Sequence, residues 1–292
     1  MMTITNAISF DVEEYFHVHA FKDVAPRDGW DLRPSRVVAS THQVLSLLRR
    51  HRVRGTFFIL GWVAERHPSL VSDIAAEGHE IASHGFAHEA VHGLSRQEFR
   101  DDLHRANDAL RNACPGVELL GYRAPSFSIN QQTPWAFEEL AFAGFQYDSS
   151  VSPATLHDNY GVRGASRFAY DTGDGVLEIP PTTVRVFGHN LPAVGGGHFR
   201  LAPLPLSKLA VKRIQREGHP VVSYFHPWEF DPDQPRVKGA SAKSRFRHYT
   251  NLALNERKLE SLLSTFAFDR MDRVFGDRIA AITAHANRVA AI

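Results

Sequence analysis

The 292-residue sequence has one cysteine, Cys114, so no disulfide can form within the chain. A lone cysteine fits a reducing compartment, and nothing beside Cys114 marks it as a nucleophile, so we interpret it as structural. An excess of charge of one sign is also lacking, because 33 Lys and Arg against 32 Asp and Glu leave a formal net charge of +1. That balance argues against nucleic-acid binding, since no basic face dominates the total.

Long hydrophobic runs are missing as well. No window approaches the roughly 18 apolar residues of a membrane-spanning helix, and the N-terminus lacks the basic and apolar segments of a secretory signal. We therefore expect a cytoplasmic protein with no transmembrane segment. Hydrophobic residues at 43% and charged residues at 22% are ordinary for a soluble globular chain. The length permits one large α/β domain or two smaller ones.

Strand-like and helix-like segments alternate along the chain, which favours a parallel sheet with crossover helices. Strands are predicted over 4–10, 55–60, 79–83, 119–122, 176–179 and 220–225. Helices are predicted over 37–50, 63–76, 95–113, 133–143, 206–217, 256–263 and 277–290, with caps at Ser35 and in a Ser95–Glu98 capping box. Between them, 151–205 is loop-rich and typical of a substrate-binding segment. With no repeat or linker, the sequence predicts one domain over 1–292.

Two histidines four residues apart, His84 and His88, follow the predicted strand at 79–83. At that spacing both imidazoles would lie on one face of a helical turn and could bind one metal ion together. A surface pair without a metal is the alternative. Four other polar clusters stand where a barrel would place its active-site loops, at 11–13, 123–125, 148–150 and 226–228. Together the clusters favour a metal-dependent hydrolase.

Asp11 and Glu13 stand at the end of the first predicted strand. Because side chains alternate along a strand, these two carboxylates share a face. One can ligate a metal while the other takes a proton from water. A turn at this point would exchange the roles of Glu13 and Glu14. Two histidines and one carboxylate suit Zn²⁺ or another borderline divalent ion.

Arg123 ends another predicted strand, where it could bridge to Asp11 and keep that carboxylate ionised and oriented. Pro125 would fix the following turn, so that the backbone N–H of Ser126 faces a developing oxyanion. An ordinary surface arginine in a turn is the alternative, but Arg123 is the only cation of a largely uncharged segment.

Asp148 and His226 complete the set of candidate catalytic side chains. Asp148 is expected to pair with Arg123 or His226. His226, flanked by Pro227 and Trp228, is a candidate general acid for a leaving amine, with a buried structural histidine as the alternative. The candidate sugar-stacking aromatics are Trp62, Trp135, Trp228, Phe127 and Tyr160.

In this order, the five segments resemble the NodB-homology polysaccharide deacetylases, which are metal-dependent carbohydrate esterases. The family's first motif, Thr-Phe-Asp-Asp, corresponds to Ser-Phe-Asp-Val-Glu at 9–13, with Val where the metal-binding Asp normally stands. The His pair, Arg-x-Pro at 123–125, Asp-Ser-Ser at 148–150 and Tyr-Phe-His at 224–226 match the other motifs. Segments 10–16, 225–230 and 245–268 resemble a narrower branch, found in exosortase-associated exopolysaccharide loci.

The resemblance implies a deformed (β/α)7-type barrel with a family-specific C-terminal extension over 236–292 packed on it. It implies removal of N-acetyl groups from N-acetylhexosamine units of a polysaccharide or its precursor. The implied cofactor is a divalent metal, zinc first and Co, Mn, Ni or Fe as alternatives, held by Glu13, His84 and His88. The implied catalytic side chains are Asp11 as base, His226 as acid, Arg123 and Asp148, while those meeting the substrate or oxyanion are Ser126, Pro125 and Trp228.

Two other interpretations stay open at this point. A related barrel could hydrolyse small linear or cyclic amides, and its pocket would be closed rather than an open groove. Because the first motif is altered, a catalytically inactive carbohydrate-binding barrel is the second. The basic stretch 236–247 would contact an anionic glycan or a lipid-linked phosphate, or would be a solvated loop. A glycan is the one partner that the sequence predicts.

Overall fold

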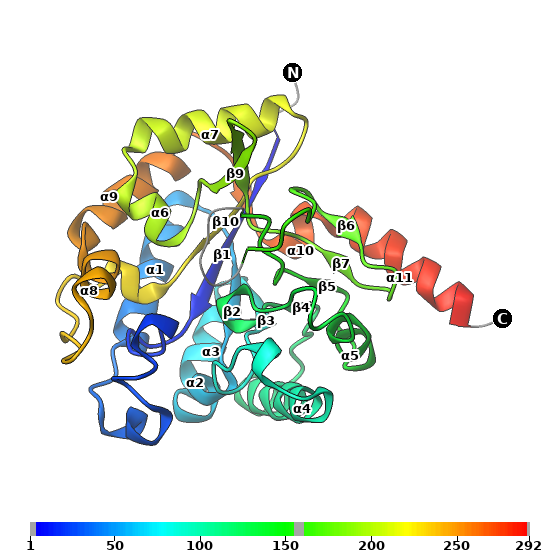
Figure 1. Cartoon of the computed structure of the whole chain (residues 1–292), viewed down its shortest axis with the longest axis horizontal. Coiled ribbons are helices and arrows are strands. Elements are labelled where there is room, and N and C mark those ends of the chain that lie inside the picture. The colour runs from blue at the N-terminus through cyan, green and yellow to red at the C-terminus, as the bar shows by residue number, and fades with distance from the viewer. Residues whose placement is uncertain (1–3, 155–160, 291–292) are drawn as a thin grey trace.

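The computed structural model describes residues 4–154 and 161–290, and one curled sheet forms its centre (Figure 1). The strand order is β10-β1-β2-β3-β4-β5-β7-β6, and β11 pairs with β1 off this path. All pairings on the path are parallel except that of β6 with β7. These strands are β1 (Asn6–Val12), β2 (Thr56–Ile59), β3 (Glu80–Ser83), β4 (Gly121–Tyr122), β5 (Tyr147–Asp148), β6 (Tyr170–Asp171), β7 (Leu177–Glu178), β10 (Val222–Phe225) and β11 (Phe268–Asp269).

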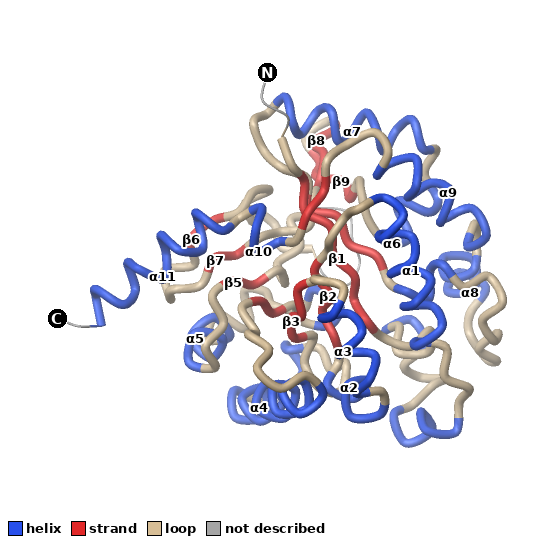
Figure 2. Tube along the Cα trace, turned by 180° about the vertical axis from the view of Figure 1, so that it is seen from behind, coloured by secondary structure: helices blue, strands red, loops and turns tan. Residues whose placement is uncertain are grey.

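Helices surround this sheet, as the view from behind shows (Figure 2). They are α1 (Val37–His51), α2 (Gly61–Arg66), α3 (Pro68–Ala76), α4 (Arg96–Ala113), α5 (Ala136–Phe142), α6 (Gly196–Leu201), α7 (Leu204–Arg216), α8 (Ala242–Tyr249), α9 (Leu252–Leu263), α10 (Met271–Val274) and α11 (Gly276–Ala290). Parallel strands with helical crossovers, curled but not closed between β6 and β10 within the described residues, confirm the expected deformed barrel.

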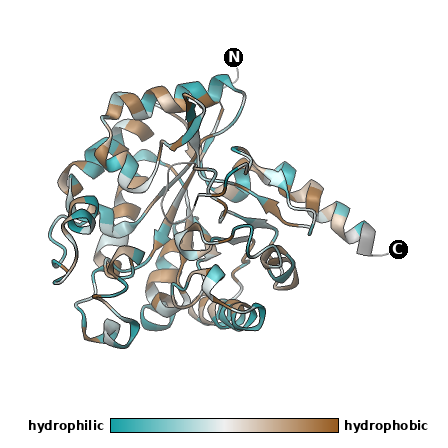
Figure 3. Cartoon of the chain, viewed as in Figure 1, coloured by the Kyte–Doolittle hydropathy of each residue, from teal (hydrophilic) through white to brown (hydrophobic). Residues whose placement is uncertain are grey.

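The core lies between the sheet and these helices. All seven residues of β1 are buried, as is typical of a parallel strand covered on both faces. Phe10 of β1 stacks on Phe57 of β2 with ring centroids 5.1 Å apart, and Phe225 of β10 packs on it from the other neighbouring strand. In Figure 3, α7 alternates along its length between polar and apolar residues, as a helix with one face on the core does.

Most predicted elements are present, with differences that have physical causes. The helix predicted over 63–76 is two helices, α2 and α3, because Pro68 begins a new helix after His67. The capping box of Ser95 and Glu98 on α4 is confirmed. Ser35 does not cap α1, whose first amides are capped by Glu14 instead.

Within the segment predicted to be loop-rich, the strand predicted over 176–179 is present as β7. The segment also contains short elements that the sequence did not indicate, namely β6, α6 and a hairpin of β8 (Thr183–Val186) and β9 (His189–Pro192). The predicted extension makes a strand contact of its own, since β11 pairs with β1 at Asn6. The division into a single domain with an extension over 236–292 stays a prediction. None of the described helices combines the length and apolarity that crossing a membrane requires.

The strand directions decide where the site lies. Parallel strands end at one edge of the sheet, and a barrel of this kind carries its site at the carboxyl ends of its strands. The segments that follow β1, β3, β4 and β10 therefore converge there, and they carry Glu13, His84, Arg123 and His226.

Candidate active site

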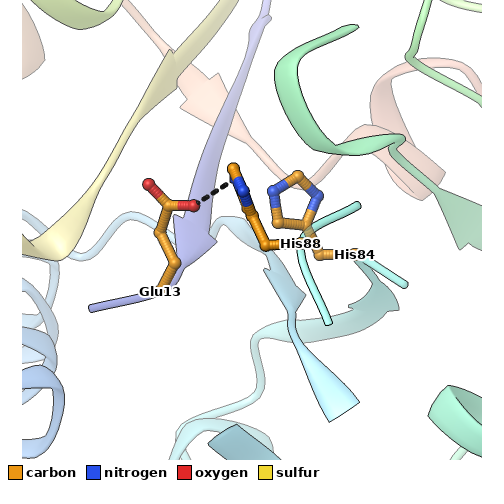
Figure 4. Close-up of side chains that lie close together, drawn as sticks. All are labelled: Glu13, His84 and His88. Atoms are coloured by element: carbon orange, nitrogen blue, oxygen red, sulfur yellow. Dashed lines mark ion pairs between the residues drawn. The ribbon is translucent and has the colours of Figure 1, made fainter. Parts of the chain in front are cut away.

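Glu13, His84 and His88 converge at the carboxyl edge of the sheet (Figure 4). Each offers one ligand atom, and these atoms lie within 4.8 Å of one another. Glu13 Oε2 is 2.7 Å from His88 Nε2, yet Glu13 Oε2 has no partner of hydrogen-bond geometry among the described residues. A cation bound between these residues would give this buried oxygen the partner that it lacks. The donor set fits a divalent metal of borderline softness.

The loop carrying the histidines is not the helical turn that the spacing predicted. Residues 84–88 form an irregular loop in which Gly85 has φ +71° and His88 has φ +54°. Asp102 of α4 holds it by accepting a 2.9 Å hydrogen bond from the amide of Phe86. Added at Gly85, a Cβ would lie 2.8 Å from Asp102 Oδ2, so this loop requires glycine.

His84 is fixed in the tautomer that a metal ligand needs. Its Nδ1 donates a 2.7 Å hydrogen bond to the carbonyl of Arg123, which leaves Nε2 for a metal. Burial lowers the pKa of His84 to about 4, so the ring is neutral at pH 7. Burial would raise the pKa of Glu13, but His88 and the other imidazoles outweigh it and hold that pKa well below its usual value. The site therefore combines an ionised carboxylate with a neutral imidazole.

The two neighbouring glutamates have separate tasks. Glu14 turns away from the histidines and accepts hydrogen bonds from the amides of Arg36 and Val37 at the start of α1. Ser35 donates to the same carboxylate. Glu13 is thus the carboxylate beside the histidines, as the alternation along the strand predicted.

Arg123 and Asp11 form the expected contact. Arg123 is fully buried, and its Nη1 donates to Asp11 Oδ1 at 2.5 Å and to Ser9 Oγ at 2.9 Å. Its Nη2 donates to Ser149 Oγ at 3.0 Å, and its guanidinium lies 4.0 Å from the ring centre of Phe58. Each face and edge of this arginine has a partner, so it holds Asp11 in one orientation.

His226 is oriented by two residues that the sequence did not indicate. Its Nδ1 lies 3.2 Å from Glu229 Oε2, and Glu229 in turn accepts a 2.9 Å hydrogen bond from Arg200. Its Nε2 points at the carboxylates, 3.9 Å from Asp11 Oδ2 and 3.8 Å from Glu13 Oε1. Burial would lower the pKa of His226, but Glu229 and the other two carboxylates raise it to about 9.

Trp228 is not the open stacking surface that the sequence suggested. Only 5% of it is exposed, and its ring stacks on His226 and His248 with centroids 5.0 and 4.1 Å away. Its indole N–H donates to Glu13 Oε1 at 3.1 Å, so it positions a candidate metal ligand. Among the other candidate aromatics, Phe127 lines the site, Trp62 and Trp135 do not, and Tyr160 lies outside the described residues.

Asp148 pairs with neither Arg123 nor His226. It accepts from the hydroxyl of Ser150 at 2.5 Å and from its amide at 3.1 Å. Its neighbour across β5 and β7 is Glu178, and burial raises the pKa of both carboxyls, that of Glu178 further because of the charge on Asp148. Burial and the proximity of the two carboxyls thus both favour their protonated forms. Asp148 is therefore placed as a structural residue.

A cavity of about 230 Å³ opens on the two histidines and Glu13. Residues from both halves of the chain line it: Asp11, Glu13, Val18, His19, Ala20, His84, His88, Ser126, Phe127, Gly196, Gly197, His198, Arg200, Leu201, Tyr224, His226, Trp228, Ser244, Arg247 and His248. Pro125 begins the turn that carries Ser126, whose φ is +57°. Gly196 and Gly197 contribute to its wall, and the preceding Gly195 packs closely on Tyr224, since a Cβ on Gly195 would lie 2.6 Å from that ring.

Known families match two consecutive segments. Residues 28–146 match the family described as "Polysaccharide deacetylase", and residues 149–276 match one described as "Domain of unknown function (DUF3473)". Over 187 residues the chain is 29% identical to a chitooligosaccharide deacetylase of a Bradyrhizobium species, covering 56% of this chain and 83% of that one. Residues 28–146 are therefore a polysaccharide deacetylase domain within this chain. The narrower branch stays a prediction. Glu13 precedes both matched segments and His226 lies in the second one, so the candidate site extends beyond the deacetylase segment.

Two further relatives share shorter stretches. A chitooligosaccharide deacetylase of Sinorhizobium fredii is 38% identical over 85 residues, which cover 29% of this chain and 40% of that one. A peptidoglycan-N-acetylglucosamine deacetylase of Bacillus cereus is 33% identical over 106 residues, covering 34% of this chain and 36% of that one. The chain thus spans less than half the length of these two deacetylases.

One solved structure supports the fold over nearly the whole molecule. A Mycobacterium smegmatis protein assigned to the polysaccharide deacetylases superposes with a TM-score of 0.61 at 22% identity. The match covers 94% of this chain and 89% of that one. The match shows that the two proteins share the curled-barrel fold.

Proposed function

We propose that this chain is a metal-dependent hydrolase, with zinc as its metal, that removes N-acetyl groups from N-acetylhexosamine units of a polysaccharide or its precursor. The observation that carries the proposal is the convergence of Glu13, His84 and His88 within 4.8 Å. They open on a cavity that Asp11 and His226 also line. The relatives named as deacetylases of chitooligosaccharides and of peptidoglycan support this substrate class.

In the proposed reaction, Glu13, His84 and His88 hold the cation, which when bound supplies Lewis-acid activation of the acetyl carbonyl and of water. Asp11, fixed by Arg123, takes a proton from the attacking water. Water adds to the acetyl carbon and the C–N bond breaks, giving acetate and a free amine on the sugar.

The second proton transfer belongs to His226. An amine leaves well only when protonated, and the imidazole faces the carboxylates with its Nε2 while Glu229 binds its other nitrogen. In the metal-free protein, Glu229 and the facing carboxylates raise the pKa of His226 to about 9, which favours the protonated imidazole that this role needs. We assign oxyanion stabilisation to the backbone N–H of Ser126, which lines the same cavity.

The test compares substrates and metal states. Protein stripped of metal and protein reloaded with zinc are incubated with N-acetylglucosamine oligomers and with a small cyclic amide, while acetate and ammonia are measured. The proposal expects acetate from the oligomers, dependent on zinc. Ammonia from the cyclic amide without acetate would instead establish the small-amide hydrolase.

Two variants separate catalysis from binding alone. Asp11→Asn should abolish acetate release, whereas the surface variant Asp73→Asn, which touches only the exposed His42 in an ion pair, should retain it. Binding of the oligomers by zinc-loaded wild-type protein with no acetate released would favour the inactive carbohydrate-binding barrel.

A further inference from the structure

Helices α6 and α8 form part of the wall of the cavity that holds the candidate metal ligands. Gly196, Gly197 and His198 of α6 and Ser244 and Arg247 of α8 line it. None of these residues is needed to hold the cation or to place Asp11 and His226. This wall is therefore where parts of the substrate beyond the reacting acetyl group would lie.

Helix α8 belongs to a segment with charge of one sign. Residues 234–255 include five Arg and Lys and no Asp or Glu. Arg247 is exposed at the cavity, and its guanidinium forms no ion pair with an acid of the described residues. A cation without a partner at the wall of a binding cavity is available to a ligand.

The acids around the cavity are already engaged, so Arg247 does not simply balance one of them. Asp11 is paired with Arg123 at 2.5 Å. Glu13 contacts His88 and the indole of Trp228. Glu229 is held by Arg200 and His226. Arg247 therefore contributes a positive charge that no acid of the described residues balances, and it lines the space left for substrate.

The backbone that carries Arg247 is pinned. The buried guanidinium of Arg200 donates to the carbonyl oxygens of Arg247, His248 and Thr250, each at 2.8 Å. The same guanidinium binds Glu229, which orients His226. The backbone at Arg247 and the candidate general acid His226 are therefore both held through one buried residue, Arg200, as a preorganised site requires.

We propose that Arg247 binds an anionic group attached next to the N-acetylhexosamine, either on the neighbouring sugar unit or as a phosphate linked to the N-acetylhexosamine itself, so that the preferred substrates are acidic glycans. A guanidinium suits this role because its fork pairs with both oxygens of a carboxylate or phosphate. The inference rests on the proposed deacetylase function and adds the charge class of its substrate. The anion is a uronate carboxylate or a phosphate, and the probes below distinguish these two sources.

The experiment measures kcat/KM for acetate release by the zinc-loaded full chain on three probes. These are a neutral N-acetylglucosamine tetramer, a tetrasaccharide alternating N-acetylglucosamine with glucuronate, and uridine diphosphate N-acetylglucosamine. We expect one of the anionic probes to exceed the neutral one by about tenfold, the factor of a charge-assisted hydrogen bond. A preference for the glucuronate probe identifies a carboxylate, and one for the nucleotide sugar identifies a phosphate. Equal values for all three would overturn the inference.

Arg247→Gln should abolish the anionic preference through a higher KM, and Arg247→Lys should retain part of it. Arg245→Gln is the matched control, because Arg245 is an exposed cation on the same helix that lines a different cavity. Loss of the preference in Arg245→Gln as well would overturn the inference in favour of a general charge effect.

Binding separates this inference from the proposed function. Affinity for the probes is measured with Asp11→Asn protein, where no turnover is expected. Arg247-dependent binding of an anionic probe would support the anion site even if wild-type protein released no acetate from any probe. The opposite result is acetate release from the neutral tetramer together with no Arg247-dependent binding of either anionic probe. That result would support the deacetylase function and refute the anion site.

Discussion

The buried guanidinium of Arg123 donates a 2.5 Å hydrogen bond to Asp11. The same guanidinium also donates to the hydroxyls of Ser9 and Ser149. Solvent water stabilises neither charged group well, because both residues are nearly inaccessible. Removing one member of a buried pair leaves the other charge uncompensated, which is costly. The pair therefore supports both the fold and the orientation of the proposed base.

Arg123→Gln should lower the free energy of unfolding by about 3–5 kcal/mol, as loss of one partner of a buried ion pair does. Adding Asp11→Asn should recover part of the loss, because the stranded carboxylate disappears. Urea unfolding of the single and double variants measures both effects. Arg100→Gln is the control, since Arg100 is half-exposed and its partner Glu139 keeps Arg96. A loss in Arg123→Gln no larger than in the control would contradict the assignment.

Adjacent alanine substitutions should separate metal binding from helix capping. Glu13→Ala should no longer retain stoichiometric zinc, because it removes one of three ligands. Glu14→Ala should retain zinc but lose about 0.5–2 kcal/mol of stability, the cost of a missing helix cap. Elemental analysis after dialysis and urea unfolding report the two effects. The reverse pattern would mean that the two glutamates have exchanged roles.

The sequence predicted those parts of the site that depend on strand direction alone. Asp11 lies near the end of β1, and His84, Arg123 and His226 each follow a strand. Because parallel strands end at one edge, the convergence of these residues needed only the order of elements. The alternation of side chains also assigned Glu13 rather than Glu14 to the histidines. These features depend on residues that are close in the sequence, so they can be predicted from the sequence alone.

The remaining parts depend on contacts between distant segments. Asp148 faces Glu178 because β7 lies beside β5. No short sequence motif predicts that these two strands pair. Likewise, the carboxylate that holds the histidine loop comes from α4, and Arg200 reaches Glu229 from α6. The sequence held a partial signal for Arg200 and Glu229. The glycine run Gly195–Gly197 precedes Arg200, and Glu229 stands three residues after His226.

Trp228→Phe should weaken zinc binding by about 10–100-fold, the usual cost of losing a hydrogen bond to a metal ligand. The phenyl ring keeps the stacking on His226 and His248, so the change isolates the indole N–H that binds Glu13. Competition with a chelating dye measures the affinity. Trp135→Phe is the control, because Trp135 packs on Phe99 away from the cavity. An unchanged zinc affinity with a raised KM for glycan would instead restore Trp228 as a sugar-stacking surface.

The pKa of His226 gives a prediction whose sign can be worked out. In the folded, metal-free protein it is raised from 6.5 to about 9, so the folded state binds the proton more tightly than the unfolded one. Stability from this proton is fully present below 6.5 and is lost as the pH rises through about 9. Nuclear magnetic resonance titration of the imidazole should give this pKa directly, and urea midpoints should fall over the same range.

Glu229→Gln tests the cause of that shift. The amide keeps the shape of the side chain but removes the charge that faces His226 at 3.2 Å, so the pKa of His226 should fall and the loss of stability should begin at lower pH. Zinc should lower it in wild-type protein too, since a bound cation offsets the charge of Glu13, which lies 3.8 Å from the ring. An imidazole that titrates near 6.5 in both proteins would show that the carboxylates do not hold its proton, and the proposed acid would lose its physical basis.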